Sequence, residues 1–270
     1  MIMYIKKLAK YILTFPQVLI CRLKGINTPW SDLVTFFRYF PFGKINKDNS
    51  VDINYRNHPV KFFYDDLGPM LAGEFAGNDY DKLPVEGVEV LDIGASCGDT
   101  PIIFALRGAS KVVGYELNER YFNLSRRNVE VNNLSNKVNL KLSGVAAKKI
   151  ESADEILAAI VPERDRSSVG TAEFKMLNEI VIDNRFTSST VMKMDVDGYE
   201  YEIFRSTSIE TLKTFSHISL EYHFGLQDIP SILKSAGFTV EVVPIIKTSI
   251  SHHPENYKNM EIGLIHAHRI

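Results

Sequence analysis

The sequence predicts an α/β domain whose mostly parallel sheet is covered by helices on both faces, preceded by a helical N-terminal extension. After Glu86, short apolar segments alternate with longer amphipathic segments of helix length. The apolar segments are nearly continuous, which is typical of strands that are buried on both faces. Glycines and prolines separate the two kinds of segment, so the strand–helix alternation of a doubly wound sheet is the arrangement we expect.

The composition supports one globular domain with an appendage. The chain has 270 residues, of which 45% are hydrophobic and 24% charged, and its formal net charge is -2. This charge gives no general attraction for a polyanion, so we do not expect nucleic acid as a partner. The only cysteines, Cys21 and Cys97, fall in different predicted elements and lack metal-ligand spacing, which argues against a disulfide and a zinc site. A reducing, cytoplasmic location fits this pattern.

Residues 1–50 are predicted to form the helical extension. Its apolar run Tyr11–Cys21 is flanked by lysines and arginines, is too short to span a bilayer and has no small-residue cleavage site. Two interpretations remain open for residues 1–24. The helix either packs on the domain, which is the commoner fate of a short apolar stretch, or lies weakly on an anionic membrane surface as a peripheral contact.

Residues 51–270 are predicted to form a Rossmann-like domain, in which residues 51–87 lead in and cap the pocket. Strands Val88–Ile93 and Lys111–Tyr115 enclose a helix over Pro101–Arg107, which together make a βαβ unit. Asp99 or Thr100 is the expected N-cap of that helix, with Pro101 at its first position.

The alternation continues to the end of the chain, apart from a predicted insertion over residues 151–173. The remaining expected elements are a helix Glu119–Asn133, a strand Val138–Leu142, a helix near Phe174–Asp183, strands Val191–Met194 and His217–Tyr222, a helix Ile229–Ala236, and closing strands Phe238–Ile245 and Ile262–Ala267.

The first candidate site is the loop DIGASCGDT, residues 92–100, between the first strand and its helix. Gly94 and Gly98 permit a sharp turn and a close backbone approach to a ligand at the helix N-terminus. Glu116 ends the next strand, 18 positions beyond Gly98 (116 minus 98), where a carboxylate can accept hydrogen bonds from the hydroxyls of an adenosine ribose.

Two cofactors would use this loop geometry, a dinucleotide or S-adenosylmethionine. The dinucleotide fingerprint needs a third glycine that is missing here, and Asp92 would place negative charge beside its phosphates. The cationic sulfonium compound tolerates that charge. Asp92 could also serve only to order the glycine loop through hydrogen bonds, and the two roles are compatible.

The second and third candidate sites follow two later strands. Asp195, Asp197 and Glu200 come after the strand Val191–Met194, and ligands collect at the carboxyl ends of strands in such sheets. Asp197 and Glu200 could equally be plain helix caps or dipole partners. Glu221 and His223 point to one side at period two, and a histidine is a natural base near neutral pH, although a lone histidine is more often structural.

These motifs together resemble the FkbM-like methyltransferases. The resemblance runs from Glu74 to Gly225 through DIGASCGDT, GYELN (114–118), NVEVNNL (128–134), KMDVDGYE (193–200) and EYH (221–223), of which KMDVDGYE is the most specific. It implies the seven-stranded class I methyltransferase sheet, S-adenosylmethionine as cofactor and methylation of an oxygen on a small molecule or sugar. Asp197 stands where the family more often has Glu, and Ser96 and Cys97 where Asn and an apolar residue are usual.

We therefore expect direct in-line methyl transfer to an acceptor oxygen, with deprotonation assisting. The predicted cofactor-binding residues are Asp92, Gly94, Ala95, Ser96, Gly98, Glu116, Leu117, Ser143 and Asp195, and the predicted catalytic residues are Glu200, Glu221 and His223. The acids at the strand ends could bind a metal ion, although no ligand spacing in the sequence demands one, and no metal ligand is predicted. The alternatives are an NAD-dependent oxidoreductase and an RNA methyltransferase on the same fold. The sequence names neither the acceptor nor an oligomeric state.

Overall fold

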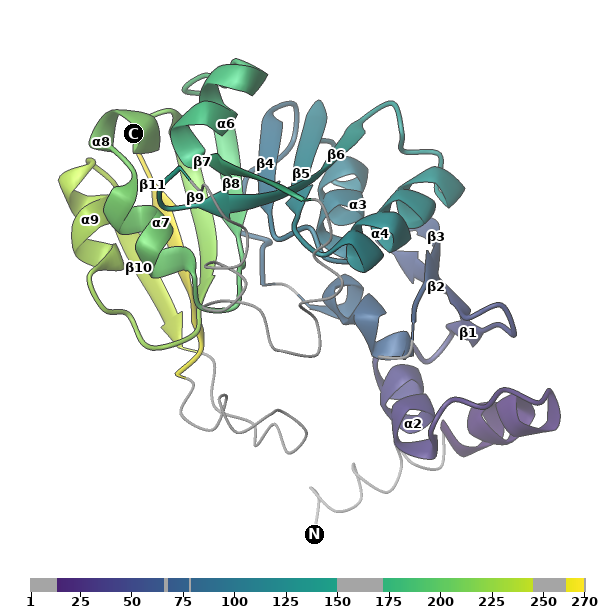
Figure 1. Ribbon diagram of the computed structural model, residues 1–270. Helices are drawn as coiled ribbons and strands as arrows, with labels where there is room; N and C mark the ends of the chain where they lie inside the picture. Colours follow the sequence, from purple (N-terminus) through teal and green to yellow (C-terminus); the bar gives the residue numbers. More distant parts are fainter. Residues whose placement is uncertain (1–13, 66–67, 78, 150–171, 245–260, 270) are drawn as a thin grey trace, which may run out of the picture.

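A central eight-stranded sheet organises the protein in the computed structural model, which describes residues 14–65, 68–77, 79–149, 172–244 and 261–269 (Figure 1). The strand order is β10-β11-β9-β8-β4-β5-β6-β7. The strands are β4 Glu89–Ile93, β5 Lys111–Glu116, β6 Val138–Ala146, β7 Glu173–Met176, β8 Thr190–Met194, β9 Phe215–Tyr222, β10 Thr239–Pro244 and β11 Gly263–His268.

The sheet is mostly parallel, as the sequence predicted. All pairs from β9 through β8, β4, β5 and β6 to β7 are parallel, whereas β11 runs antiparallel to both β9 and β10. The expected seven strands are present, and β7 adds an eighth on the edge of β6. Phe174 was assigned to a helix but lies in β7, because pairing with β6 overrides the local helical pattern and the helix α6 starts only at Leu177.

Helices cover both faces of the sheet. Their bounds are α3 Asp99–Leu106, α4 Glu119–Val131, α6 Leu177–Asn184, α7 Glu200–Ser206, α8 Ile209–Leu212 and α9 Ile229–Ser235. Successive strand residues belong to opposite cores: Val90 packs in the cluster that contains α3 and α4 residues, and Leu91 in the cluster that contains α6, α7 and α9 residues. This two-sided burial explains why the strands read as continuous apolar runs.

The start of α3 differs from the sequence prediction. Gly98, in a left-handed conformation with φ of 90°, occupies the cap position and supplies no side-chain cap, so neither Asp99 nor Thr100 is the N-cap. Pro101 is the third residue of the helix rather than the first. It is still tolerated there, because the first four N–H groups of a helix have no intrahelical partner.

The N-terminal part packs against the α3 and α4 side of the domain. It consists of a helix over residues 14–23, the helix α2 Trp30–Tyr39, a small sheet β1-β2-β3 and the 3-10 helix η1 Pro69–Ala76. The small sheet has strands β1 Lys44–Ile45, β2 Ser50–Tyr55 and β3 His58–Phe63, so strand structure begins before Val51. In Figure 1 the purple helices lie at the lower right, next to η1, which α2 contacts.

The helix over residues 14–23 is apolar on two sides. Val18 and Cys21 are buried in the core, whereas Phe15, Leu19, Ile20 and Leu23 are exposed by 45% or more. Within the described part of the chain, none of the helices combines the length and the apolar character needed to cross a membrane. The predicted insertion over residues 151–173 lies outside the described residues as far as residue 171, and its last residue, Glu173, belongs to β7 because it pairs with β6. The apolar run before Thr14 also falls outside the described residues.

Candidate active site

The predicted site residues gather at the carboxyl ends of β4, β5, β8 and β9. β4 lies between β5 and β8, so the chain leaves it towards one side of the sheet and later returns on the other. In open α/β sheets ligands bind at such a switch point, outside the carboxyl ends of the strands, and we call this region the crevice. The strand order thereby brings Gly94, Glu116, Asp195 and Glu221 to one edge of the sheet.

The two glycines of the loop permit close backbone packing. Both have positive φ, 79° for Gly94 and 90° for Gly98. A Cβ on Gly94 would stand 1.8 Å from the carbonyl oxygen of Asp195, and one on Gly98 would stand 3.0 Å from Ser125 in α4. These glycines therefore form the sharp turn that the sequence predicts and hold the loop against the β8–α7 connection and α4. Their close approach to a ligand stays a prediction.

Asp92 lies beneath the loop in a buried ion pair with Lys193. The two residues are direct partners in the β4–β8 ladder, both side chains are 2% exposed or less, and Lys193 Nζ is 3.3 Å from Asp92 Oδ1. Lys193 also donates to the Gly94 carbonyl at 2.7 Å, and Thr100 donates to Asp92 at 2.6 Å. These contacts support the loop-ordering role of Asp92. Direct contact with the cofactor stays a prediction.

Lys193 received no role from the sequence, although it belongs to the KMDVDGYE motif. Burial alone would lower its pKa, but the carboxylates of Asp92, Asp195 and Asp99 hold that pKa above its ordinary value. Lys193 is therefore a permanent cation at the base of an acidic crevice. Burial raises the pKa of Asp92, and the charge of Lys193 opposes that rise.

Glu116 has the geometry expected of a ribose-binding carboxylate. Its Oε2 accepts the Ser96 N–H at 2.7 Å, and its Oε1 accepts the Asn118 N–H at 2.7 Å. Ser96 adopts a φ of 45°, which is uncommon for a residue other than glycine and directs its N–H towards the carboxylate. Burial raises the pKa of Glu116 to about 7, against the lowering effect of these two hydrogen bonds. Each oxygen keeps a free lone pair for a ligand hydroxyl.

The other predicted cofactor residues lie along the loop and towards β6. Ala95 is fully buried and donates its N–H to the Tyr115 carbonyl. Ser143 is 5% exposed and donates to the Gly144 carbonyl at 3.2 Å, and Leu117 lies over Gly144. The contact of these residues with the cofactor stays a prediction.

Glu200 and His223 form a buried pair. Glu200 is fully buried; its Oε1 accepts the His223 backbone N–H at 3.0 Å and lies 3.2 Å from His223 Nδ1, and its Oε2 accepts the Gly198 N–H at 2.9 Å. It is therefore no simple helix cap, because it joins the start of α7 to the end of β9. Its contact with His223 Nδ1 is suited to orienting the imidazole, and a catalytic role for Glu200 stays a prediction.

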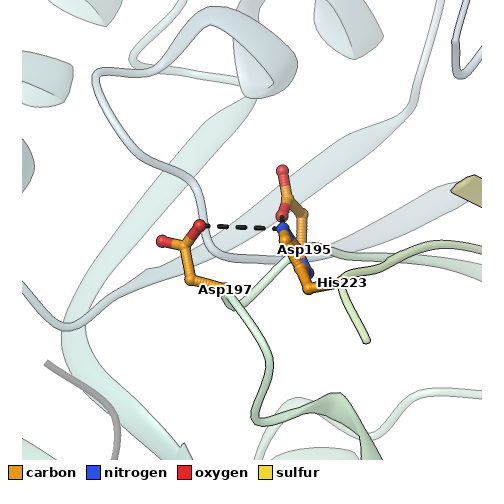
Figure 2. A group of neighbouring side chains, drawn as sticks. All are labelled: Asp195, Asp197 and His223. Atoms are coloured by element: carbon orange, nitrogen blue, oxygen red, sulfur yellow. Dashed lines mark ion pairs between the residues drawn. The ribbon is translucent and has the colours of Figure 1, made fainter. Parts of the chain in front are cut away.

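His223 Nε2 faces three carboxylates. It is 3.6 Å from Asp195 Oδ1 and 3.7 Å from Asp197 Oδ1 (Figure 2). The third carboxylate oxygen, Glu221 Oε1, is at 3.5 Å. Burial alone would lower the pKa of His223, but the bond to Glu200 and the charges of Asp195 and Asp197 raise it to about 9. Burial, followed by the charge of Asp195, raises the pKa of Glu221 to about 8.

The structure adds acidic residues that the sequence analysis did not assign to the site. Burial raises the pKa of Glu74, in η1, to about 8, and that of Asp99, in α3, to about 7. Within the described part of the chain, Asp99 Oδ1 is a buried oxygen without a hydrogen-bond donor. Asp99 lies inside the DIGASCGDT motif, so its position was visible in the sequence. No sequence pattern indicated that Glu74 belongs to the site, because only the packing of η1 on α3 brings it to the crevice.

Two asparagines of the NVEVNNL motif attach the small sheet to the domain. Asn128, fully buried in α4, accepts the Phe63 N–H and donates to the carbonyls of Phe63 and Cys97. Asn132 makes the same pair of bonds with the backbone of Lys61. These side chains complete the edge of β3 and connect it to the glycine loop.

The charge of the crevice fits a cationic cofactor. An unsatisfied carboxylate oxygen on Asp99 and a buried Glu116 with free lone pairs are suited to ammonium, sulfonium and hydroxyl groups. A pyrophosphate would meet these carboxylates at close range, and the charge of Lys193 is already paired with Asp92.

Comparison with known proteins identifies the domain. A model of the methyltransferase FkbM domain matches residues 92–240, more than half of the chain. The ribosomal protein L11 methyltransferase of Aquifex aeolicus (strain VF5) is 34% identical over 74 residues, which are 27% of this chain and 29% of that protein. The matched stretch is thus less than a third of the curated relative.

Solved structures of similar shape are distant in sequence. The methyltransferase domain of delta-N METTL16 has a TM-score of 0.45 and 14% identity, covering 74% of this chain and 83% of that one. TrmK of M. capricolum, solved with S-adenosyl-homocysteine, has a TM-score of 0.44 and 13% identity. The match covers 71% of this chain and 66% of that one.

Proposed function

This chain belongs to the methyltransferase FkbM domain family and uses S-adenosylmethionine, and from that premise we propose that it methylates a hydroxyl oxygen of a small molecule or a sugar. S-adenosylmethionine supplies the electrophilic methyl group when bound. The family membership decides against the NAD-dependent oxidoreductase alternative. The residues of this chain then have to hold the cofactor, align the acceptor and take up its proton.

The observation that carries the proposal is the cluster of Glu221, Asp195 and Asp197 around His223 at the ends of β8 and β9. A hydroxyl is a weak nucleophile until it loses its proton, so a base beside the acceptor is useful for oxygen methylation. With a pKa of about 9, the His223 imidazole already carries its proton at neutral pH. We therefore assign proton acceptance to Glu221, whose pKa of about 8 makes its ionised form a stronger base than an ordinary carboxylate.

The acidic character of this cluster disfavours an RNA acceptor. Asp195, Asp197 and Glu221 would repel the phosphates of a nucleic acid that placed a base in the crevice, whereas they can bind the hydroxyls of a sugar. The curated relative is named for a ribosomal protein, and that name describes the relative and not the acceptor of this chain.

The proposal is tested by following a labelled methyl group. The full chain is incubated with methyl-labelled S-adenosylmethionine and a cell extract divided into small-molecule, protein and RNA fractions. Label in the small-molecule fraction, on oxygen by fragmentation in a mass spectrometer, is the expected result. Glu221→Gln should reduce it by about 10²-fold or more, the usual contribution of a general base. Label confined to protein or RNA would overturn the proposal.

A further inference from the structure

The ligand-type atoms of Asp195, Asp197 and His223 converge on one point. One carboxylate oxygen from each aspartate and one imidazole nitrogen all lie within 4.8 Å of one another. In Figure 2 dashed lines join the imidazole nitrogen to one carboxylate oxygen of Asp197 and to one of Asp195. The three residues come from two connections, β8–α7 and β9–α9, which only the sheet brings together.

The hydrogen bonding of His223 leaves its Nε2 without a matching partner. The side chain is 4% exposed, and Nδ1 is held by Glu200 at 3.2 Å. Because Glu200 accepts, Nδ1 carries the proton in the neutral ring, and the lone pair of Nε2 then points at carboxylate oxygens, which are acceptors as well. Within the described part of the chain, Nε2 forms no hydrogen bond, and its nearest carboxylate oxygens are at 3.5 to 3.7 Å.

Two species can supply a positive charge between these groups: the second proton of the imidazole when no metal ion is bound, or a metal ion that replaces this proton, and the distances bear on which of the two fits. A proton on Nε2 would draw one carboxylate to about 2.8 Å, and these contacts are at or beyond the limit of a hydrogen bond. A metal ion bound at about 2.1 Å separates neighbouring ligand atoms by about 3.0 to 3.4 Å. The observed distances of 3.6 and 3.7 Å are closer to the metal arrangement.

The surroundings repeat the outer shell of a metal site. Ligating histidines commonly donate their second N–H to a carboxylate, which fixes the ring and its tautomer. Glu200 provides this contact and is itself held by two backbone N–H groups, from Gly198 and His223. A fully buried carboxylate with these three partners indicates that the imidazole is oriented for a task at Nε2.

We infer that Asp195, Asp197 and His223 bind a divalent first-row transition cation of the Mn²⁺ class, with open coordination positions on the crevice side. One imidazole nitrogen favours such an ion over Mg²⁺ and Ca²⁺, which prefer oxygen alone. The Asp197 side chain is 74% exposed and that of Asp195 is 34% exposed, so water or a ligand oxygen can complete the coordination. Glu221, 3.5 Å from Nε2, is close enough to contact a bound water.

The role of this ion rests on the proposed function, whereas its binding does not. A cation at this point would lower the pKa of a coordinated acceptor hydroxyl. The hydroxyl proton would pass to the Glu221 carboxylate, and the oxygen would form its bond to the methyl group while the methyl–sulfur bond breaks. The His223 imidazole would then be a ligand rather than a base.

The test uses Mn²⁺ alone, without cofactor or acceptor. The full chain is dialysed against a chelator and titrated with Mn²⁺, whose free-ion electron paramagnetic resonance signal disappears on binding. One saturable site is expected, with a ¹⁴N coupling from imidazole in pulsed spectra. Zn²⁺ should displace Mn²⁺, and an equal concentration of Mg²⁺ should not. The absence of a saturable site, of the nitrogen coupling or of this preference would overturn the inference.

Variants assign the binding to these residues. Asp197→Asn changes a largely exposed side chain, so the protein should fold, and Mn²⁺ affinity should fall at least 10-fold. His223→Gln should abolish the nitrogen coupling, and Glu200→Gln should weaken binding by about 10- to 100-fold, as other outer-shell changes do. The matched control is His217→Gln, near the start of β9, the strand after which His223 follows. Unchanged affinity in Asp197→Asn and His223→Gln would contradict the site.

The two proposals fail independently. If the protein does not bind Mn²⁺, the metal site is refuted, but oxygen methylation with Glu221 as the base is not. If the label is found only on protein or RNA, oxygen methylation of a small molecule is refuted, but the metal site is not.

Discussion

Single carboxylates in this protein differ in role according to what surrounds them. Glu116 retains lone pairs for a ligand although two backbone N–H groups bind it, whereas Asp92 is fully buried and tied to Lys193 and Thr100. Both were predicted to bind the cofactor. Their surroundings indicate a direct contact for Glu116 and a supporting position for Asp92.

Glu116→Gln should weaken S-adenosylmethionine binding. A neutral amide loses the charge-assisted hydrogen bonds to the ribose hydroxyls, so a loss of roughly 10- to 100-fold in affinity is expected in calorimetry. The matched control is Glu130→Gln, which changes an exposed side chain of α4. Equal affinity in Glu116→Gln and the control would reject the ribose assignment.

Lys193→Met should destabilise the fold. It leaves Asp92 as an uncompensated buried carboxylate and removes the donor to the Gly94 carbonyl, which together cost about 3 to 5 kcal/mol of unfolding free energy. Urea denaturation measures this loss. The double variant Lys193→Met with Asp92→Asn should recover part of it, because the unpaired charge is gone. A double variant no more stable than Lys193→Met would show that the ion pair is not the cause.

At the scale of elements, two N-terminal segments have a role beyond packing: the small sheet β1-β2-β3 and the helix over residues 14–23. The small sheet β1-β2-β3 is attached to the glycine loop through Asn128, so the lead-in segment supports the site. The helix over residues 14–23 buries Val18 and Cys21, as expected if it packs on the domain, yet it also presents an exposed apolar row. The alternative of a weak membrane-surface contact therefore remains a proposal with a defined surface.

The exposed row can be tested on vesicles. Leu19 and Leu23 are 45% and 80% exposed and lie beside Arg22 and Lys24, an arrangement suited to an anionic bilayer surface. Leu19→Ser with Leu23→Ser should reduce co-sedimentation with anionic vesicles by about 10-fold, with little change in melting temperature. Ile182→Ser, 71% exposed on α6, is the control. Equal co-sedimentation of all three proteins would refute the contact.

At the scale of the whole molecule, the crevice makes folding dependent on pH. Glu74, Asp99 and Glu116 have pKa values of about 8, 7 and 7 in the folded protein, above those of free carboxyls. The folded state thus binds more protons than the unfolded state between the usual and the raised values. Stability falls with rising pH in that interval, and the loss is complete above the raised values.

The cofactor-free protein should therefore lose stability between pH 6.5 and 8.5. His217 and His266, whose pKa values are lowered by burial, give a weak slope of opposite sign that ends at about pH 7.5, where both are neutral in the unfolded state as well. The melting temperature should fall across this range, and less steeply in Asp99→Asn. S-adenosylmethionine should raise it more at pH 8 than at pH 6.5, because its cationic groups favour ionised carboxylates. A melting temperature that rises across the range would contradict the acidic-crevice account.

The sequence by itself determined the α/β fold, the glycine loop and the set of strand-end acids. Continuous apolar strands, capped helices and short motifs are local patterns, and they predicted the strands of the sheet to within a few residues at most ends. Period two placed Glu221 and His223 on one side, and the structure confirms that they meet.

Only the tertiary structure decided which of these acids act together. The β4–β8 register pairs Asp92 with Lys193, the packing of η1 brings Glu74 to the crevice, and two separate connections join Asp197 to His223. Pairing with β6 also places Phe174 in a strand, whereas its local pattern predicted a helix. These outcomes depend on contacts between residues far apart in the chain, and no local pattern encodes a contact whose energy arises from burial beside a distant partner.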